Sequence, residues 1–232
     1  MNIDNLDFDD EDKLDASILS VCFPICCVSE SNGIVDSGTG FIINNNGVFL
    51  SAGHVFENGM NNYKVYYKEN EYKVEAIYKE HDKDKGEDLF IGKLVGFKEE
   101  LPFCIELTNP NLINNKSELY FAGFNLRKCY FAEKGTTGYL IECNGIPYYG
   151  HVLSVRLVDA KDKPINKSED KRISIGNMKC LSIGDSAIYR GLSGGPVFSN
   201  EKVFGVFLAD VFVTSDYIKE ILIEKSINLI SD

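Results

Sequence analysis

Residues 191–198 read GLSGGPVF and place the hydroxyl group of Ser193 among three glycines, immediately before an apolar run. Glycine, proline and serine are common in surface turns, so this segment could simply be a turn that leads into a strand. The alternative is a nucleophile, because neighbours without side chains let backbone N–H groups and a substrate approach the hydroxyl closely. A nucleophilic serine needs a base that accepts its proton, so the rest of the sequence decides between the two interpretations.

Three histidines could supply this base. His81 lies in the charged segment KEHDKDKG, where a solvated surface histidine is the default interpretation. His151 falls inside an expected strand, where a structural or surface role is favoured. His54 follows the run FLSAG, in which a buried strand ends in small residues and presents an imidazole at the strand end. His54 is therefore the predicted base.

A histidine base also needs a carboxylate that fixes its tautomer and stabilises the imidazolium. Asp88 is the best candidate, because it stands where a charged loop meets the apolar run LFIGKL, at the start of an expected strand. Asp82, Asp84 and Glu87 lie close by but inside the charged loop, where solvation is expected. A structural role as a strand-start residue is the alternative for Asp88.

The order His54, Asp88, Ser193 along the chain separates the folds that share this chemistry. An α/β-hydrolase carries its serine in the same Gly-x-Ser-x-Gly pattern, but its histidine follows the serine, and no histidine follows Ser193. A subtilisin-like order needs an acid before the histidine and an α/β pattern, which this strand-rich chain does not offer. Histidine, acid and then serine is the order of the chymotrypsin-type fold.

Four segments in this order resemble the successive signatures of trypsin-like serine peptidases, in a style nearest to the bacterial and intracellular branch that includes the high-temperature-requirement proteases. They are TGFII (39–43), LSAGHV (50–55), DLFIGKL (88–94) and GLSGGP (191–196), and the resemblance covers about residues 17–210. It implies that Ser193 attacks a scissile carbonyl, His54 moves the proton and Asp88 orients His54. The backbone N–H groups of Gly191 and Ser193 would form the oxyanion hole, and the substrate would be a protein or peptide.

The chain also departs from secreted trypsins. Those enzymes carry an aspartate directly before the serine and pair it with a freed amino terminus, whereas this chain has Leu192, so activation by that salt bridge is not expected. The resemblance implies that the floor of the pocket for the residue before the scissile bond lies six residues before the serine, at Ala187, and this residue does not support a preference for Lys or Arg. Four further residues are expected near the substrate: Asp185 and Asp210 at the pocket walls, where they could restore that preference, and Leu208 and Ala209 beside the substrate backbone.

The segments that position these residues are mostly expected strands, because short runs rich in Val, Ile, Tyr and Phe are interrupted by Gly, Asn, Asp and Lys. The expected strands are Ile18–Val28, Gly40–Ile43, Val48–Ser51, Tyr63–Tyr67, Tyr72–Tyr78, Leu89–Leu94, Phe103–Leu107, Leu119–Phe124, Thr137–Ile141, Tyr148–Leu157, Lys179–Ile183, Pro196–Phe198 and Val203–Leu208. One helix is expected, with Ser215 as its N-cap and apolar residues near helical spacing after it.

The chain is therefore expected to be all-β, with two chymotrypsin-like antiparallel β-barrels and a C-terminal α-helix. Its expected segments are an acidic N-terminal arm (1–16), an N-terminal barrel with His54 and Asp88 (17–107), a connector (108–118), a C-terminal barrel with Ser193 (119–210) and the C-terminal helix (211–232).

Charge and cysteine content exclude several classes of function. The formal net charge of the 232-residue chain is −11, and no stripe of Arg and Lys is visible, so nucleic acid is not an expected partner. The N-terminus is acidic where a secretory signal would be basic, and the apolar run Ile18–Val28 is too short to cross a bilayer. A cytoplasmic protein without a membrane partner is therefore expected. Seven cysteines without a C-x-x-C pair predict reduced, buried thiols, and neither a metal nor a cofactor is expected.

One alternative function stays open on the sequence alone. A peptidase fold with an intact but inactive triad could serve as a catalytically silent module for peptide binding or assembly. Because a cytoplasmic protease must avoid indiscriminate cleavage, a regulatory protein partner is a further expectation.

Overall fold

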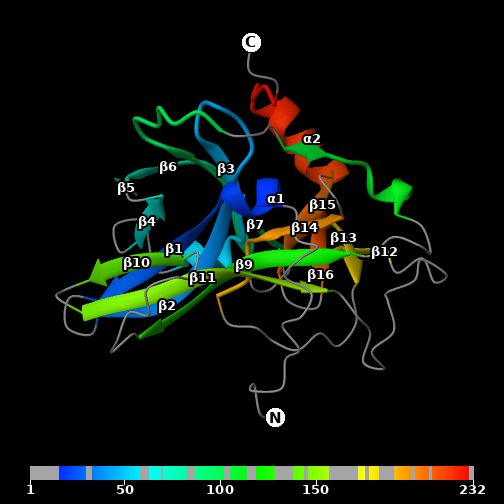
Figure 1. Cartoon of the computed structure of the whole chain (residues 1–232). Helices are drawn as coiled ribbons and strands as arrows, with labels where there is room; N and C mark the ends of the chain where they lie inside the picture. The colour runs from blue at the N-terminus through cyan, green and yellow to red at the C-terminus, as the bar shows by residue number, and fades with distance from the viewer. Residues whose placement is uncertain are drawn as a thin grey trace.

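The structure is a computed structural model, which describes residues 16–29, 33–57, 63–68, 70–82, 87–101, 105–113, 119–128, 138–143, 146–156, 172–175, 178–182, 191–199, 202–208 and 211–229. These residues form two β-sheets and two α-helices (Figure 1).

Seven strands form the first sheet, in the order β5, β4, β1, β2, β3, β7, β6, and each neighbouring pair is antiparallel. The strands are β1 (Cys22–Ser29), β2 (Gly33–Ile42), β3 (Val48–Ser51), β4 (Tyr63–Tyr67), β5 (Asn70–Tyr72), β6 (Val74–Asp82) and β7 (Glu87–Leu94). The turn between β2 and β3 is the one that its Asn and Gly residues predict. The side chain of Asn44 accepts hydrogen bonds from the backbone N–H groups of Asn46 and Val48, and Gly47 has a φ of 75°.

Nine strands form the second sheet, in the order β10, β11, β9, β14, β15, β16, β13, β12, with β8 beside β15. They are β8 (Glu106–Leu107), β9 (Tyr120–Lys128), β10 (Gly138–Cys143), β11 (Ile146–Arg156), β12 (Arg172–Ile175), β13 (Met178–Ser182), β14 (Pro196–Ser199), β15 (Lys202–Phe207) and β16 (Val211–Thr214). All pairs are antiparallel except β8 with β15, which is parallel.

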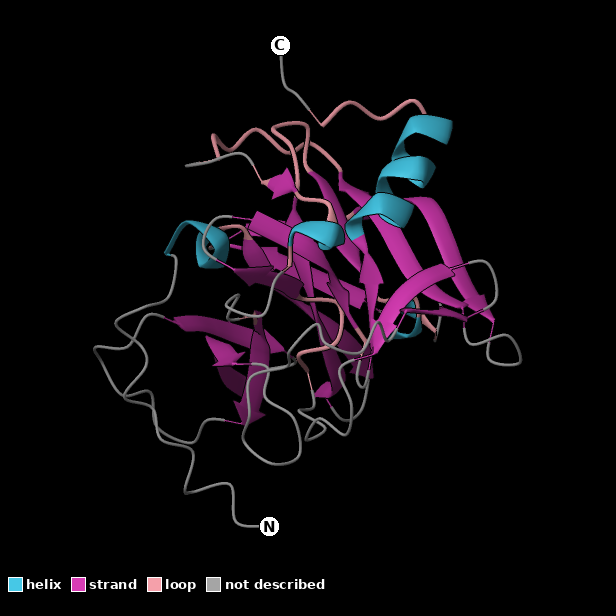
Figure 2. Cartoon of the chain, turned by 90° about the vertical axis from the view of Figure 1, so that its right-hand side faces the viewer, coloured by secondary structure: helices cyan, strands magenta, loops and turns pink. Residues whose placement is uncertain are grey.

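Two α-helices accompany the sheets, α1 (Ala16–Ser20) and α2 (Ser215–Glu224), with 3-10 turns at His54–Phe56 and Pro110–Leu112. Thr214 is the N-cap of α2, and the helix buries Tyr217, Ile218, Ile221 and Leu222. These side chains lie against the second sheet, where α2 contacts β13, β15 and β16 (Figures 1 and 2). No helix in the described ranges is long and apolar enough to cross a membrane.

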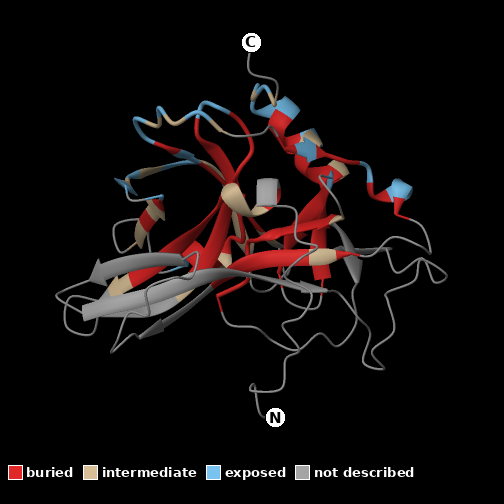
Figure 3. Cartoon of the chain, in the orientation of Figure 1, coloured by how far each residue is buried: buried red, intermediate tan, exposed pale blue. Residues whose placement is uncertain are grey.

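The largest apolar core is shared by the two sheets (Figure 3). It runs from Phe23, Phe49 and Phe90 in the first sheet to Val206 in the second sheet and Ile218 in α2, all of them at most 1% exposed. A second core inside the second sheet includes Leu192, Phe121 and Phe207, and the last two rings stack with centroids 4.2 Å apart. Because one core spans both sheets, the ends of strands from the two sheets are held in fixed positions relative to each other.

The C-terminal segment also contacts the first sheet directly. Glu80 on β6 accepts a hydrogen bond from the hydroxyl of Tyr217 on α2 at 3.3 Å, and another from the hydroxyl of Tyr78. The side-chain amide of Asn44 donates to the carbonyl of Asn228 at 3.0 Å. Helix α2 is therefore tied to β6, the strand that runs beside Asp88 on β7.

The expected all-β class, with two antiparallel barrels and a C-terminal helix, is confirmed, but several boundaries were wrong. The expected strand Ile18–Val28 begins only at Cys22, because the ladder with β2 starts there, and the residues before it form α1. Tyr72–Tyr78 is split between β5 and β6. Strand β12 was not expected at all.

Two segment boundaries shift for the same physical reason. Residues 106–107 were expected in the first barrel and 211–214 in the C-terminal helix, but both form strands that pair with β15 in the second sheet. The residues VFVT of β16 are β-branched or aromatic and fully buried, which favours a strand between β15 and β13 over a helical turn. The helix itself begins at Ser215, the residue that was expected as its N-cap.

Candidate active site

His54 and Asp88 come from neighbouring strands of the first sheet. Strand β3 ends at Ser51 and the chain enters the 3-10 turn that starts with His54, while Asp88 is near the start of β7, which pairs with β3. Nδ1 of His54 lies 2.5 Å from Oδ2 of Asp88, and the backbone N–H of His54 donates to Oδ1 of Asp88 at 2.6 Å. Both carboxylate oxygens are therefore engaged by the same histidine. The neutral ring carries its proton on Nδ1, which leaves Nε2 as the atom that can accept one.

The glycine before His54 makes this close pairing possible. A Cβ atom on Gly53 would overlap the backbone carbonyl of Glu80 and lie 3.0 Å from Oδ1 of Asp88. A side chain at this position would push β6 and the carboxylate away from His54. The glycine directly before His54 is thus explained by packing.

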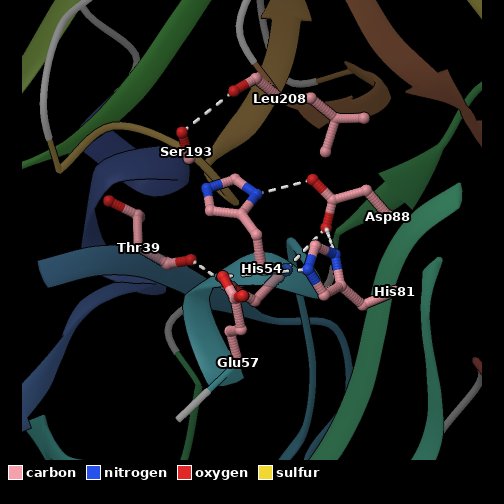
Figure 4. Close-up of polar contacts among 8 residues, drawn as sticks. Thr39, His54, Glu57, His81, Asp88, Ser193 and Leu208 are labelled. Carbon is pink, nitrogen blue, oxygen red and sulfur yellow. Dashed lines mark hydrogen bonds and ion pairs between the residues drawn. The ribbon is translucent and has the colours of Figure 1, made fainter. Parts of the chain in front are cut away.

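Ser193 lies beside the imidazole, on the side opposite Asp88 (Figure 4). It belongs to the turn between Gly191 and β14, and its side chain is half-buried. Its hydroxyl donates to the backbone carbonyl of Leu208 at 2.9 Å. Because a hydroxyl has one proton, it cannot donate to His54 while it donates to Leu208.

The turn that carries Ser193 requires glycine. Gly191 and Gly194 have φ values of 90° and 91°, where residues with a Cβ are strained. A Cβ on Gly191 would overlap the carbonyl of Phe124, and one on Gly194 would overlap the carbonyl of Thr39. The glycines therefore allow both the conformation of the turn and its close approach to neighbouring backbone.

Leu192 explains how the turn is anchored without an acid before the serine. Its side chain is fully buried in the core of the second sheet. The N–H of Gly194 donates to the carbonyl of Phe207 at 2.7 Å, and the N–H of Phe207 donates to the carbonyl of Gly195 at 2.8 Å. The position that holds a charged residue in secreted trypsins is here a hydrophobic anchor.

His81 is the clearest disagreement between the sequence interpretation and the structure. It was expected in a solvated loop, but β6 extends to Asp82, pairs His81 with Asp88 and leaves the histidine side chain only 15% exposed. Its Nδ1 lies 3.7 Å from Oδ1 of Asp88 and its Nε2 lies 3.9 Å from Oε2 of Glu57 (Figure 4). Neither nitrogen has a hydrogen-bond partner among the described residues. The acid that contacts His54 therefore has a second histidine as its cross-strand neighbour.

Leu208 and His151 lie within the described ranges. Leu208 follows β15, is 7% exposed and accepts the Ser193 hydroxyl through its carbonyl. His151 lies in the middle of β11. Four expected residues of the substrate pocket lie outside the described residues: Asp185, Ala187, Ala209 and Asp210. Within the described ranges, no group of three or more His, Cys, Asp and Glu side chains is arranged to hold a metal ion.

The sequence did not identify Thr39 as a residue of the site, and it placed His81 in a solvated loop instead of beside Asp88. Thr39 on β2 donates its backbone N–H to the carbonyl of Ser193 and its hydroxyl to the carbonyl of Gly191. The only sequence signal for Thr39 was its place in the TGFII segment. For His81, a predicted β6–β7 hairpin with the right register would have placed it opposite Asp88.

Comparison with known proteins assigns the family. Residues 27–215 match the family model named Trypsin, and this range contains both sheets apart from the first residues of β1. The comparison with curated proteins gave no match. The family match covers more than half of the chain and includes His54, Asp88 and Ser193 in their expected order. The chain therefore belongs to the trypsin family of serine peptidases.

Proposed function

We propose that this protein is a serine endopeptidase that uses Ser193 as nucleophile, His54 as general base and acid, and Asp88 as the group that orients His54. The observation that carries the proposal is the double contact between His54 and one carboxylate, at 2.5 and 2.6 Å, with Ser193 on the other side of the ring. Membership of the trypsin family supports it independently.

The proposed reaction proceeds by two acyl transfers. Oγ of Ser193 bonds to the peptide carbonyl carbon while its proton passes to Nε2 of His54, and the carbonyl oxygen becomes an oxyanion bound by the N–H groups of Gly191 and Ser193. The imidazolium then gives its proton to the leaving amine as the C–N bond breaks. Water, deprotonated by the same nitrogen, releases the acyl group and restores the serine hydroxyl.

Asp88 has two tasks in this scheme. Its Oδ2 holds the proton of Nδ1, so Nε2 faces the nucleophile with a lone pair, and its negative charge stabilises the imidazolium that forms during the reaction. Its Oδ1 accepts the backbone N–H of His54 and thereby fixes the carboxylate itself. No cofactor is needed for any of these steps.

One observation favours the alternative function, a catalytically silent peptidase module that binds peptides or serves in assembly. The Ser193 hydroxyl is engaged by the Leu208 carbonyl and must rotate before His54 can receive its proton. In an enzyme the same contact describes a resting state, which a substrate or a regulatory partner would release. We favour the enzyme, because the turn, the histidine and the carboxylate are otherwise arranged for catalysis.

Peptide hydrolysis tests the proposal. Wild-type protein and two variants, Ser193→Ala and Ser199→Ala, are incubated with a peptide library, and cleavage products are identified by mass spectrometry. Ser199 lies at the end of β14 in the same segment, so its variant controls for the loss of a nearby serine hydroxyl. We expect cleavage by wild type and Ser199→Ala and none by Ser193→Ala. Absence of cleavage by properly folded wild type would favour the silent module, and cleavage that survives Ser193→Ala would refute the nucleophile.

Further parts of the proposal concern branch, place and regulation. Leu192 in place of an acid supports an assignment to the bacterial and intracellular branch of the family. We propose that the enzyme acts in the cytoplasm. We also propose that a regulatory protein partner orders its active site. Cell fractionation tests the location. Cleavage rates measured before and after addition of cell extract test the partner, because a gated enzyme becomes faster.

A further inference from the structure

Thr39 makes two hydrogen bonds with the segment that carries the nucleophile. Its backbone N–H donates to the carbonyl of Ser193 at 2.9 Å, and its hydroxyl donates to the carbonyl of Gly191 at 2.8 Å. The same hydroxyl oxygen accepts the backbone N–H of Phe124 on β9 at 2.8 Å. Thr39 is fully buried, so these hydrogen bonds form away from water, where an unpaired partner would be costly.

These contacts fix the direction of successive peptide planes around Ser193. The carbonyl of Gly191 points to the Thr39 hydroxyl, that of Leu192 points to the N–H of Gly195 at 3.1 Å, and that of Ser193 points to the N–H of Thr39. In a planar trans peptide the N–H group points opposite to the carbonyl. The N–H of Ser193 is therefore directed away from Gly195, and the two carbonyls bound by Thr39 fix the peptide planes on either side of it, which carry the N–H groups of Leu192 and Gly194.

Thr39 is itself held from the side of the histidine. Its carbonyl accepts the hydroxyl of Ser51 at 2.7 Å, and Ser51 is the last residue of β3, shortly before His54. Strand β9 packs so closely that a Cβ on Gly123 would lie 2.7 Å from the Thr39 hydroxyl oxygen. One buried residue of the first sheet thus connects the strand that ends at the general base with the turn that carries the nucleophile.

We propose that Thr39 is a positioning residue for the oxyanion hole and for the nucleophile. Its hydroxyl holds the Gly191–Leu192 peptide and its backbone N–H holds the Ser193–Gly194 peptide, so the Leu192–Ser193 peptide between them, which carries the N–H of Ser193, keeps its direction toward the oxygen of the reacting carbonyl. Its backbone N–H holds Ser193 at a set distance from His54. This role rests on the proposed peptidase function and adds a residue of the first sheet to the nucleophile turn and the oxyanion hole, both of which were expected from the second barrel alone.

The hydroxyl is the group on which the role depends. A serine at this position has the same hydroxyl and can make both side-chain hydrogen bonds, whereas valine has the shape of threonine but can make neither. Thr39→Val therefore leaves the Gly191 carbonyl and the Phe124 N–H without their partner. The backbone contact with Ser193 stays possible in both variants.

The test compares Thr39→Val and Thr39→Ser with wild type, using the best substrate of the peptide library. Thr108→Val is the matched control, because Thr108 is also a buried threonine but lies beside the start of β15, away from the Ser193 turn. The concentration of active sites is measured by titration with an acylating reagent that releases one equivalent of product per site. Rates are expressed per active site, so that a partly unfolded sample does not lower kcat. A peptide boronic acid, whose tetrahedral adduct places an oxygen in the oxyanion hole, serves as the probe of transition-state affinity.

For Thr39→Val we expect kcat to fall by about 100-fold with KM changed by less than about threefold, because misplaced oxyanion donors act in the transition state. The affinity for the boronic acid should fall by a similar factor, and Thr39→Ser should stay within about fivefold of wild type in both readouts. A merely structural role would lower the number of titrated sites but leave kcat per site and boronate affinity unchanged, and that result would overturn the proposal.

Two further outcomes are informative. If Thr39→Val does not fold, Ser51→Ala replaces it, because loss of the hydrogen bond to the Thr39 carbonyl should loosen Thr39 and lower kcat per site by about tenfold; an unchanged kcat would count against the role. Labelling of wild-type Ser193 by a fluorophosphonate is measured alongside. Wild type that is not labelled would overturn the proposed function together with this inference, whereas labelled wild type with fully active Thr39→Val would overturn the inference alone.

Discussion

Replacement of Asp88 by asparagine should leave the fold intact and force His54 into a tautomer that cannot act as a base. The carboxylate has one oxygen 2.6 Å from the backbone N–H of His54 and the other 2.5 Å from Nδ1. In Asp88→Asn one of these atoms becomes an NH₂ group. The backbone N–H cannot change its protonation, so the amide oxygen must stay opposite it, and the NH₂ group must face Nδ1. Nδ1 then becomes an acceptor, and the proton of the neutral ring moves to Nε2.

The expected loss can be worked from these contacts. Any arrangement that restores the productive tautomer places two donors against each other, which costs about 2 kcal/mol. The variant also lacks the negative charge beside the imidazolium, worth about 4 kcal/mol for a partly buried pair whose charges are centred about 4 Å apart. Together these effects amount to about 6 kcal/mol, or about 10⁴-fold in kcat, which is the size of the loss that this replacement causes in a Ser-His-Asp protease.

Two measurements check this prediction. Turnover of a peptide substrate gives kcat, and ¹⁵N NMR of the histidine ring nitrogens, assigned with His54→Ala, gives the tautomer. Asp216→Asn is the control, because Asp216 accepts a backbone N–H in the first turn of α2, and its variant should keep full activity. The reasoning is refuted if Asp88→Asn keeps more than about a tenth of the wild-type kcat, or if its His54 still carries the proton on Nδ1.

Three more predictions concern the turn and the C-terminal contacts. Gly194→Ala should lower the free energy of unfolding in urea by more than about 2 kcal/mol and abolish cleavage, since φ is 91° and the new Cβ would overlap the Thr39 carbonyl; a stability equal to wild type would show that the turn can rearrange. Leu192→Asp should lower the melting temperature without raising the cleavage rate, because it places an unpaired charge in an apolar core; a faster enzyme would indicate that a trypsin-like salt bridge can form. The pKa of Tyr78 is raised above its usual value of 10.0, first by burial and then by its hydrogen bond to Glu80. As the pH rises, the unfolded protein therefore loses this proton before the folded protein does. The contribution of Tyr78 to the free energy of unfolding should be fully present below pH 10 and decline above it, and the decline should be shallower in Tyr78→Phe. Equal declines of the free energy of unfolding with pH in the two proteins, measured by urea titration, would contradict this.

The residues of the site that could be predicted from sequence are those with a recognisable pattern among their immediate neighbours in the chain. His54 follows a strand that ends in small residues, Asp88 opens an apolar strand, and Ser193 lies between glycines, so each has a signal within a few residues. The order of the three along the chain then separated one fold from its rivals. None of this required knowledge of strand pairing.

What could not be predicted depends on contacts between distant segments. Thr39 acts on residues about 150 positions away, and its own neighbours give no hint of that. His81 was placed in a loop because its charged neighbours outweighed the register of β6 with β7, which sets it opposite Asp88. The strand at 211–214 was missed because three apolar residues and a threonine before a helix resemble the first turn of that helix until β13 and β15 are known to flank them.

The most direct test of the triad is the location of a fluorophosphonate adduct by peptide mass spectrometry in wild type and in His54→Ala. A competent serine should carry a single phosphonyl group on Ser193 in wild type, and the His54→Ala protein should remain unmodified under the same conditions. An adduct on any other residue, or equal modification of Ser193 without His54, would contradict the assignment of nucleophile and base.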